Sequence, residues 1–140
     1  MTRLFVKNTL ILVALCASIA RAFSVDLTVT PAAATNDYVG KIVLAISGVA
    51  PGTTTRIEKY FDLNANGVID AGDALSQSFV VRDGTVPTSF PDGANYVRNW
   101  NIPADEDGAA NGQIRVELPY PGLDGVTDFV AGARLFKVSD

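Results

Sequence analysis

A stretch of twelve residues, 62–73, places oxygen-bearing side chains at intervals that suit one calcium ion. Such side chains fall at loop positions 1, 3, 5, 9 and 12, glycine falls at position 6, and position 7 offers a backbone carbonyl. Ca²⁺ takes about six to eight oxygen ligands, and these intervals let a short loop wrap around the ion. The spacing predicts Ca²⁺ as a bound cofactor, with ligands from Asp62, Asn64, Asn66, Val68, Asp70 and Asp73.

Two other positions of the loop fit the same interpretation, and one departs from it. Gly67 stands where the chain must turn sharply, and Ile69 is expected to point away from the ion into the protein. The pattern D-x-[DN]-x-[DN]-G-x5-E is matched at every constrained position except the last, where Asp73 replaces Glu. This shorter carboxylate is expected to lower the affinity rather than prevent binding. The alternative is an Asn- and Gly-rich turn whose side chains satisfy its own backbone.

The first 22 residues have the features of a secretory signal peptide. Arg3 and Lys7 form a basic start, and residues 10–19 form an apolar run that is shorter than the ~20 residues needed to span a bilayer. Residues 20–22 supply a small-x-small cleavage site, so the mature chain is expected to begin at Phe23. Cys16 raises the alternative of a lipoprotein signal, but Leu15 occupies the position that needs a small residue. We expect a protein that is secreted or held at the cell surface.

Residues 23–140 have the size of one domain with a single core. They carry eight basic and fifteen acidic residues, a net charge of −7, which argues against nucleic acid or anionic membranes as partners. They contain no cysteine, so stability must come from the core or from bound metal. No transmembrane segment is expected in the mature chain. The chain is compatible with a complete short protein and with the first domain of a longer one.

Seven short β-like runs separated by turn residues follow the signal peptide, and no segment keeps a helical period over ten residues. The predicted fold is therefore all-β, an immunoglobulin-like sandwich of two antiparallel sheets with the calcium loop inserted between strands. Trp100 is expected in its core. The runs are 24–30, 38–47, 53–61, 76–82, 96–102, 113–118 and 128–138.

The run that precedes the loop has two possible periods. Ile57, Tyr60 and Phe61 are spaced as on a helix, whereas Thr55, Ile57, Lys59 and Phe61 alternate as on a strand. The β-branched residues that follow a Pro-Gly turn favour a strand that runs straight into the loop. After Asp73, only about one helical turn fits before the next strand.

Residues 62–75 resemble a dockerin-type calcium repeat, the kind of module that docks enzymes onto extracellular scaffolds. The shared residues are Asp62, Asn64, Asn66, Gly67, Asp70 and Asp73, followed by Leu75. Dockerins carry two such repeats on helices, whereas this chain has one. The wider arrangement is similar to bacterial secreted Ig-like modules with an inserted calcium loop. The resemblance implies a structural or adhesive role, with calcium-dependent docking of an extracellular protein as an alternative.

Other groups of residues offer less chemistry. The chain has no histidine, and no nucleophile or phosphate-loop motif occurs, so it is not expected to be an enzyme. The distant alternative is a glycosidase that uses Asp105 and Glu117. The acidic cluster 105–108 is expected to be a solvated loop, with completion of the calcium site or a weaker ion of its own left open. Trp100 and Tyr96 would be the stacking surface if the domain binds polysaccharide.

Overall fold

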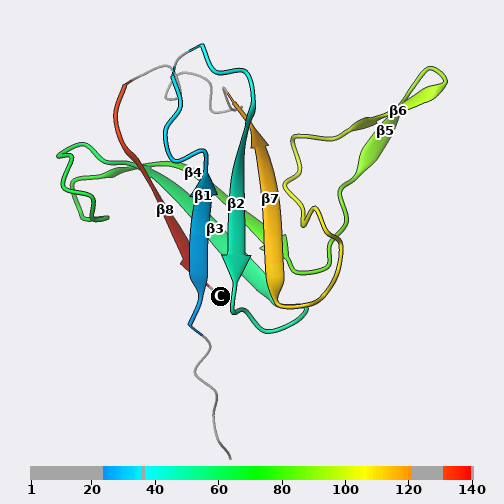
Figure 1. Ribbon diagram of the computed structural model, residues 1–140, viewed down its shortest axis with the longest axis horizontal. Helices are drawn as coiled ribbons and strands as arrows, with labels where there is room; N and C mark the ends of the chain where they lie inside the picture. Colours follow the sequence, from blue (N-terminus) through cyan, green and yellow to red (C-terminus); the bar gives the residue numbers. More distant parts are fainter. Residues whose placement is uncertain (1–23, 36, 121–130, 140) are drawn as a thin grey trace, which may run out of the picture.

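The computed structural model describes residues 24–35, 37–120 and 131–139 (Figure 1). The predicted all-β class is confirmed, because these residues form strands and no helix. The eight strands are β1 (Asp26–Thr30), β2 (Lys41–Ser47), β3 (Thr54–Phe61), β4 (Ala74–Arg82), β5 (Ser89–Asp92), β6 (Asn95–Arg98), β7 (Gln113–Pro119) and β8 (Arg134–Ser139). The predicted signal peptide, 1–22, lies outside the described residues. No helix in the described ranges is long and apolar enough to cross a membrane.

The strands form two three-stranded sheets and one hairpin. The order is β1-β2-β7 in the first sheet and β4-β3-β8 in the second, β5 pairs with β6, and all these pairs are antiparallel. Figure 1 shows β1, β2 and β7 lying across β3 and β4, with the β5–β6 hairpin extending away from both sheets. The arrangement is consistent with the predicted sandwich of antiparallel sheets.

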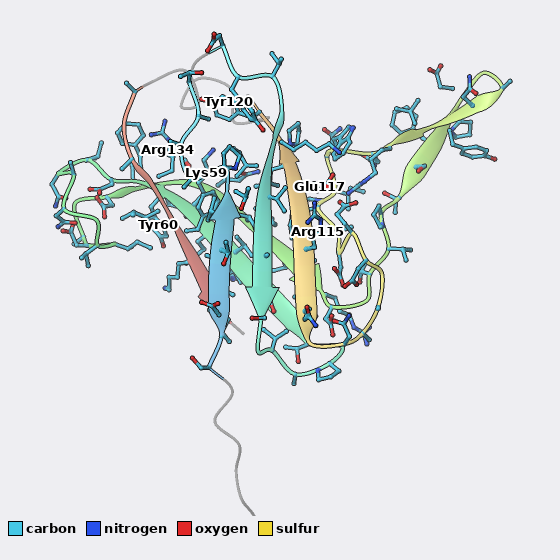
Figure 2. All side chains as sticks on the ribbon, viewed as in Figure 1. Lys59, Tyr60, Arg115, Glu117, Tyr120 and Arg134 are labelled. Atoms are coloured by element: carbon cyan, nitrogen blue, oxygen red, sulfur yellow. The ribbon has the colours of Figure 1, made fainter. Side chains whose placement is uncertain are left out.

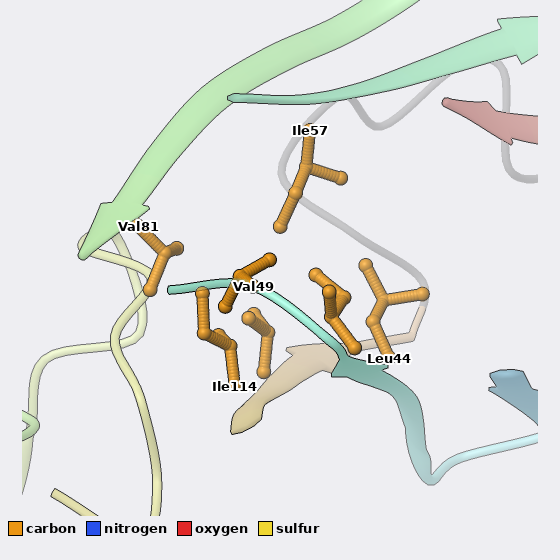
Figure 3. Close-up of a cluster of buried hydrophobic side chains, with 7 residues drawn as sticks. Leu44, Val49, Ile57, Val81 and Ile114 are labelled. Atoms are coloured by element: carbon orange, nitrogen blue, oxygen red, sulfur yellow. The ribbon is translucent and has the colours of Figure 1, made fainter. Parts of the chain in front are cut away.

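The core follows from the alternation of side chains along the strands. Leu44 on β2 pairs with Val116 on β7, and Ile46 pairs with Ile114, so four apolar side chains of the first sheet share one face. Ile57 on β3 supplies the opposite layer (Figure 3). Fully burying such a side chain contributes about 1.5–3 kcal/mol. The complete buried cluster is Leu44, Ile46, Val49, Ile57, Val81, Ile114 and Val116.

The two ends of the sandwich differ. At one end, which we call the closed end, β4 ends and β7 begins. The loops at this end contain the buried residues Val49, Asp83 and Asp105. At the loop end, residues 62–73 connect β3 to β4. A cavity of about 830 Å³ opens at the loop end. Its apolar lining includes Val29, Ile42, Phe79, Leu118 and Phe136, which are only partly buried.

Three details of the predicted elements are wrong. The run 96–102 is a strand only as far as Arg98, and it pairs with the unpredicted β5. Trp100 therefore follows β6, is half-buried and is not part of the buried core cluster. The start of β4 at Ala74 agrees with the prediction that at most about one helical turn fits after the loop. Of the last predicted run, 128–130 lie outside the described residues and β8 begins only at Arg134.

Candidate functional site

The predicted calcium loop is the connection between two neighbouring strands of one sheet. Phe61 at the end of β3 pairs with Ala74 at the start of β4, so residues 62–73 leave and re-enter the sheet at adjacent points. The ribbon in Figure 1 shows this loop as a green extension beside β8. The backbone N–H of Asp62 donates to the carbonyl of Ala133, 3.1 Å away, just before β8. The loop is thereby joined to β3, to β4 and to the residue that precedes β8. The expected strand from 53–61 into the loop is confirmed.

Asp62 begins the loop and is only 4% exposed. Its Oδ1 accepts a hydrogen bond from the Asn66 N–H at 3.2 Å, and its Oδ2 accepts one from the Gly67 N–H at 2.9 Å. Gly67 has a φ of +74°, the left-handed conformation expected at this turn. The buried carboxylate is therefore satisfied by two charge-assisted hydrogen bonds from the loop itself.

Asn64, Asn66 and Asp70 converge on one atom. The side-chain amides of both asparagines donate to Asp70 Oδ2, each at 2.9 Å. Asp70 Oδ1 accepts from the Gly72 N–H at 2.8 Å. These bonds, the one from Gly72 foremost, lower the pKa of the Asp70 carboxyl below its ordinary value, since each favours the charged form. Asp70 is thus ionised at neutral pH.

Asp73 closes the loop from its far end. Its Oδ1 accepts from the Leu63 N–H at 3.2 Å, and its Oδ2 accepts from the Asp70 N–H at 2.9 Å. The five predicted side-chain ligands therefore belong to one network of hydrogen bonds. Even so, the described residues contain no group of three or more carboxylate, imidazole or thiol side chains that could hold a metal ion. These hydrogen bonds give the loop the self-satisfied bonding of an Asn/Gly-rich turn.

The apolar residues of the loop divide between two environments. Ile69, expected to point into the protein, is half-buried. Val68, whose backbone carbonyl is the predicted ligand, has an exposed side chain. Leu63 and Leu75 are also more than half exposed, at 61% and 53%. Three large apolar side chains therefore lie in solvent on or beside the loop.

The acidic cluster 105–108 belongs to the closed end of the sandwich. Asp105 is fully buried, and its carboxylate accepts from the backbone N–H groups of Gly84 at 2.9 Å and Arg115 at 3.0 Å. The prediction of a solvated loop is therefore wrong for Asp105, although Asp107 is exposed. Because β4 separates residue 73 from residue 83 by nine strand residues, about 30 Å, Asp105 does not complete the calcium loop.

A second buried carboxylate, which no pattern in the sequence indicated, lies beside Asp105. Asp83 is 2% exposed, and its Oδ2 accepts from the backbone N–H groups of Gly52 at 2.8 Å and Gly112 at 2.9 Å. The only local signal was the Asp83-Gly84 pair, which is typical of an ordinary turn. Its partners are about thirty residues away along the chain, and no local pattern identifies them.

The carboxylates of the glycosidase alternative are already occupied. Asp105 is turned into the closed end and bonded to the backbone. Glu117 on β7 accepts from Lys41 Nζ at 2.5 Å and from Arg115 Nη2 at 3.2 Å. Figure 2 shows Arg115 and Glu117 on this strand. The two cations, Lys41 first, lower the pKa of the Glu117 carboxyl, which suits an ionised carboxylate rather than a general acid.

Trp100 and Tyr96 lie in different settings. Tyr96 is 78% exposed on β6. Trp100 is half-buried at the base of the hairpin and lines the cavity. Lys41 Nζ lies over its ring at 4.5 Å from the centroid, and the Arg98 guanidinium lies at 4.9 Å. Cation–π contacts therefore occupy the indole that would stack on sugar in the alternative of a polysaccharide-binding domain.

Comparison of this chain with family models, with curated proteins and with solved structures finds no match.

Proposed function

We propose that this protein is a secreted calcium-binding β-sandwich module of the Ig-like type, with a structural or adhesive role outside the cell. The calcium ion is held in the loop 62–73 by side-chain oxygens of Asp62, Asn64, Asn66, Asp70 and Asp73 and by the carbonyl of Val68. The observation that carries the proposal is the convergence of both asparagine amides on Asp70 in a loop with ligand spacing.

Small movements would convert this network into a ligand set. Rotating the Asn64 and Asn66 amides by half a turn exchanges nitrogen for oxygen, which directs two further oxygens toward Asp70. Without that rotation of Asn64, the Oδ1 atoms of Asp62 and Asn64 both accept from the Asn66 N–H, at 3.2 and 3.1 Å, so a carboxylate oxygen and an amide oxygen already share one donor. Three carboxylates within twelve residues repel one another, and a divalent cation would remove that repulsion.

Calcium would act as a clamp on one sheet. The loop joins β3 to β4, and its first backbone N–H is bonded to the residue before β8. An ion that binds only the folded state adds about 2.7 kcal/mol at 100 times its Kd. This is a large part of a total stability of roughly 5–15 kcal/mol. Extracellular modules can use weak sites, with Kd on the order of 10⁻⁴–10⁻³ M.

Calcium titration of the secreted form, residues 23–140, tests the proposal. We expect saturable heat by calorimetry and a melting temperature that falls when EDTA is added. Both effects should be lost in Asp70→Ala and kept in Asp107→Ala, a matched exposed carboxylate at the closed end. If millimolar calcium gives neither heat nor a change in melting temperature, the loop is a turn and the proposal is wrong.

The exposed apolar residues of the loop favour a second candidate, calcium-dependent docking of another extracellular protein. Leu63, Val68 and Leu75 are each more than half exposed next to the predicted ion. An ordered loop would present them as a fixed apolar surface. A pull-down of secreted proteins with calcium or EDTA tests this role, with Leu63→Ser as the loop variant and Val80→Ser, also exposed, as the control. Equal recovery with calcium and EDTA would count against it.

A further inference from the structure

The chain contains two Asn-Gly pairs, Asn66-Gly67 and Asn111-Gly112. This pair is chemically labile, because glycine lacks the Cβ that would hinder its backbone nitrogen from reaching the neighbouring side-chain carbonyl. Attack by that nitrogen closes a succinimide ring and releases ammonia. The surroundings of each pair decide whether ring closure occurs in the folded protein.

At Asn66 the loop supplies groups that would assist the attack. The Gly67 N–H donates to Asp62 Oδ2 at 2.9 Å, so a carboxylate is in position to take the proton of the attacking nitrogen. The Val68 N–H donates to Asn66 Oδ1 at 2.7 Å, which polarises the carbonyl and stabilises charge that develops on its oxygen. The loop therefore places a base, Asp62, at the attacking nitrogen and a hydrogen-bond donor, the Val68 N–H, at the carbonyl that is attacked.

Asn111 has the same hydrogen bonds in a different environment. The Gly112 N–H donates to Asp83 Oδ2 at 2.9 Å, and the Gln113 N–H donates to Asn111 Oδ1 at 2.8 Å. Gly112, however, is buried, and a Cβ placed on it would lie 2.6 Å from the Val49 carbonyl oxygen. Gly67 is exposed, with nothing within 4 Å of the same position. Gly67 therefore has more room than Gly112 for the backbone movement that ring closure needs.

We propose that Asn66 is a site of spontaneous deamidation, with Asp62 as the base, and that the fold protects Asn111. The Gly67 nitrogen bonds to Asn66 Cγ while its proton passes to Asp62. The Cγ–Nδ2 bond then breaks, and Nδ2 leaves as ammonia after regaining that proton. Water opens the succinimide at either carbonyl, which gives aspartate or isoaspartate. No oxidant or cofactor takes part.

The two products would affect the loop in opposite ways, a consequence that rests on the proposed calcium function. Aspartate at loop position 5 fits the ligand pattern and adds a charge that strengthens cation binding. Isoaspartate lengthens the backbone by one atom and shifts the later ligands, Asp70 and Asp73, out of register. The loop would then lose calcium as the protein ages.

The experiment compares the two sites in one sample. The secreted form is held in mildly alkaline buffer with EDTA, and peptide mass spectrometry follows amide loss at Asn66 and Asn111. We expect loss at Asn66 to be at least about tenfold faster, the ratio that a modest barrier difference produces. In urea, where the fold is absent, the two rates should become similar. Equal rates in the folded protein, or faster loss at Asn111, would overturn the proposal.

Two further measurements distinguish the role of Asp62 from the role of calcium. Asp62→Asn should slow the reaction at Asn66 alone, whereas a variant that failed to fold would react at both sites at the urea rates. An unchanged rate at Asn66 in folded Asp62→Asn would overturn the role of the base. Added calcium should slow Asn66 alone by stiffening the loop. If calcium does not slow the reaction, the result counts against the calcium function. The deamidation proposal is tested separately, by the rates of amide loss at Asn66 and Asn111.

Discussion

Asp62, Asp83 and Asp105 show what individual acidic residues do in this chain. Each is at most 4% exposed, and each accepts hydrogen bonds from two backbone N–H groups. Burying a carboxylate is costly unless such charge-assisted bonds replace its water. The acidic composition is therefore only partly a property of the surface, since three of the carboxylates organise loops.

Glu117 gives a prediction at the same scale. The Lys41 ammonium and then the Arg115 guanidinium hold the pKa of Glu117 below its ordinary value of 4.5. Lys41→Met should raise this pKa toward that value, with a smaller rise in Arg115→Met, as measured by NMR titration of the Glu117 carboxyl carbon. If Lys41→Met leaves the pKa unchanged, the ion pair seen in the structure does not persist in solution.

The sign of the linked stability change follows from this direction. Because folding lowers the pKa of Glu117, its ion pair adds to the unfolding free energy above the unfolded-state pKa. That contribution is lost as the pH falls through the lower folded-state pKa. Lys41→Met should therefore reduce the stability difference between neutral and acidic pH, by a small amount because Lys41 is partly exposed.

Among the elements, β3 shows how well a local sequence pattern can predict a strand. The alternation of Thr55, Ile57, Lys59 and Phe61 predicted this strand, and the first three are buried while Phe61 is partly buried. The competing helical spacing of Ile57, Tyr60 and Phe61 did not decide the structure. β5, and with it the β5–β6 pairing, was missed because all four residues of β5 are exposed and leave no alternation to detect. Its signal was the Asp92-Gly93 turn between short runs.

The candidate site was predictable only in part, for the same reason. The ligand intervals and the turn at Gly67 are local, and the sequence contains them. The bond from Asp62 to Ala133 and the cations over Trp100 join segments far apart in the chain. Asp105 was misassigned because its burial depends on Gly84 and Arg115, and a short acidic stretch before glycine looks solvated by itself.

Asp105 yields a prediction about how the elements are joined. Its carboxylate links the turn after β4 to β7, so Asp105→Ala leaves two N–H groups without their acceptor. We expect the unfolding free energy to fall by roughly 2–5 kcal/mol. Urea titration measures it, with Asp107→Ala as the exposed control, for which we expect a much smaller loss. Similar losses of unfolding free energy in both variants would mean that the Asp105 carboxylate does not hold the segments of the closed end together.

At the scale of the whole molecule, the described residues are packed unequally at the two ends of the sandwich. The buried core extends to the closed end through Val49 and Val81, where Asp83 and Asp105 bind the loops. The loop end has partly buried apolar residues around a cavity of about 830 Å³. Fewer buried contacts permit local opening at lower free energy, so the loop end is where a bound ion can change stability most.

Hydrogen exchange followed residue by residue tests this view of the molecule. Calcium should slow exchange most at amides that hold the proposed site together, those of Asp62, Gly67 and Asp70. The closed-end amides of Gly84 and Arg115, held by Asp105, should change less, because calcium reaches them only by stabilising the whole fold. In Asp70→Ala, calcium should no longer slow hydrogen exchange more at the loop end than at the closed end. A larger slowing at Gly84 and Arg115 than in the loop would put the ion elsewhere, and calcium would then not be the clamp on the β3–β4 connection.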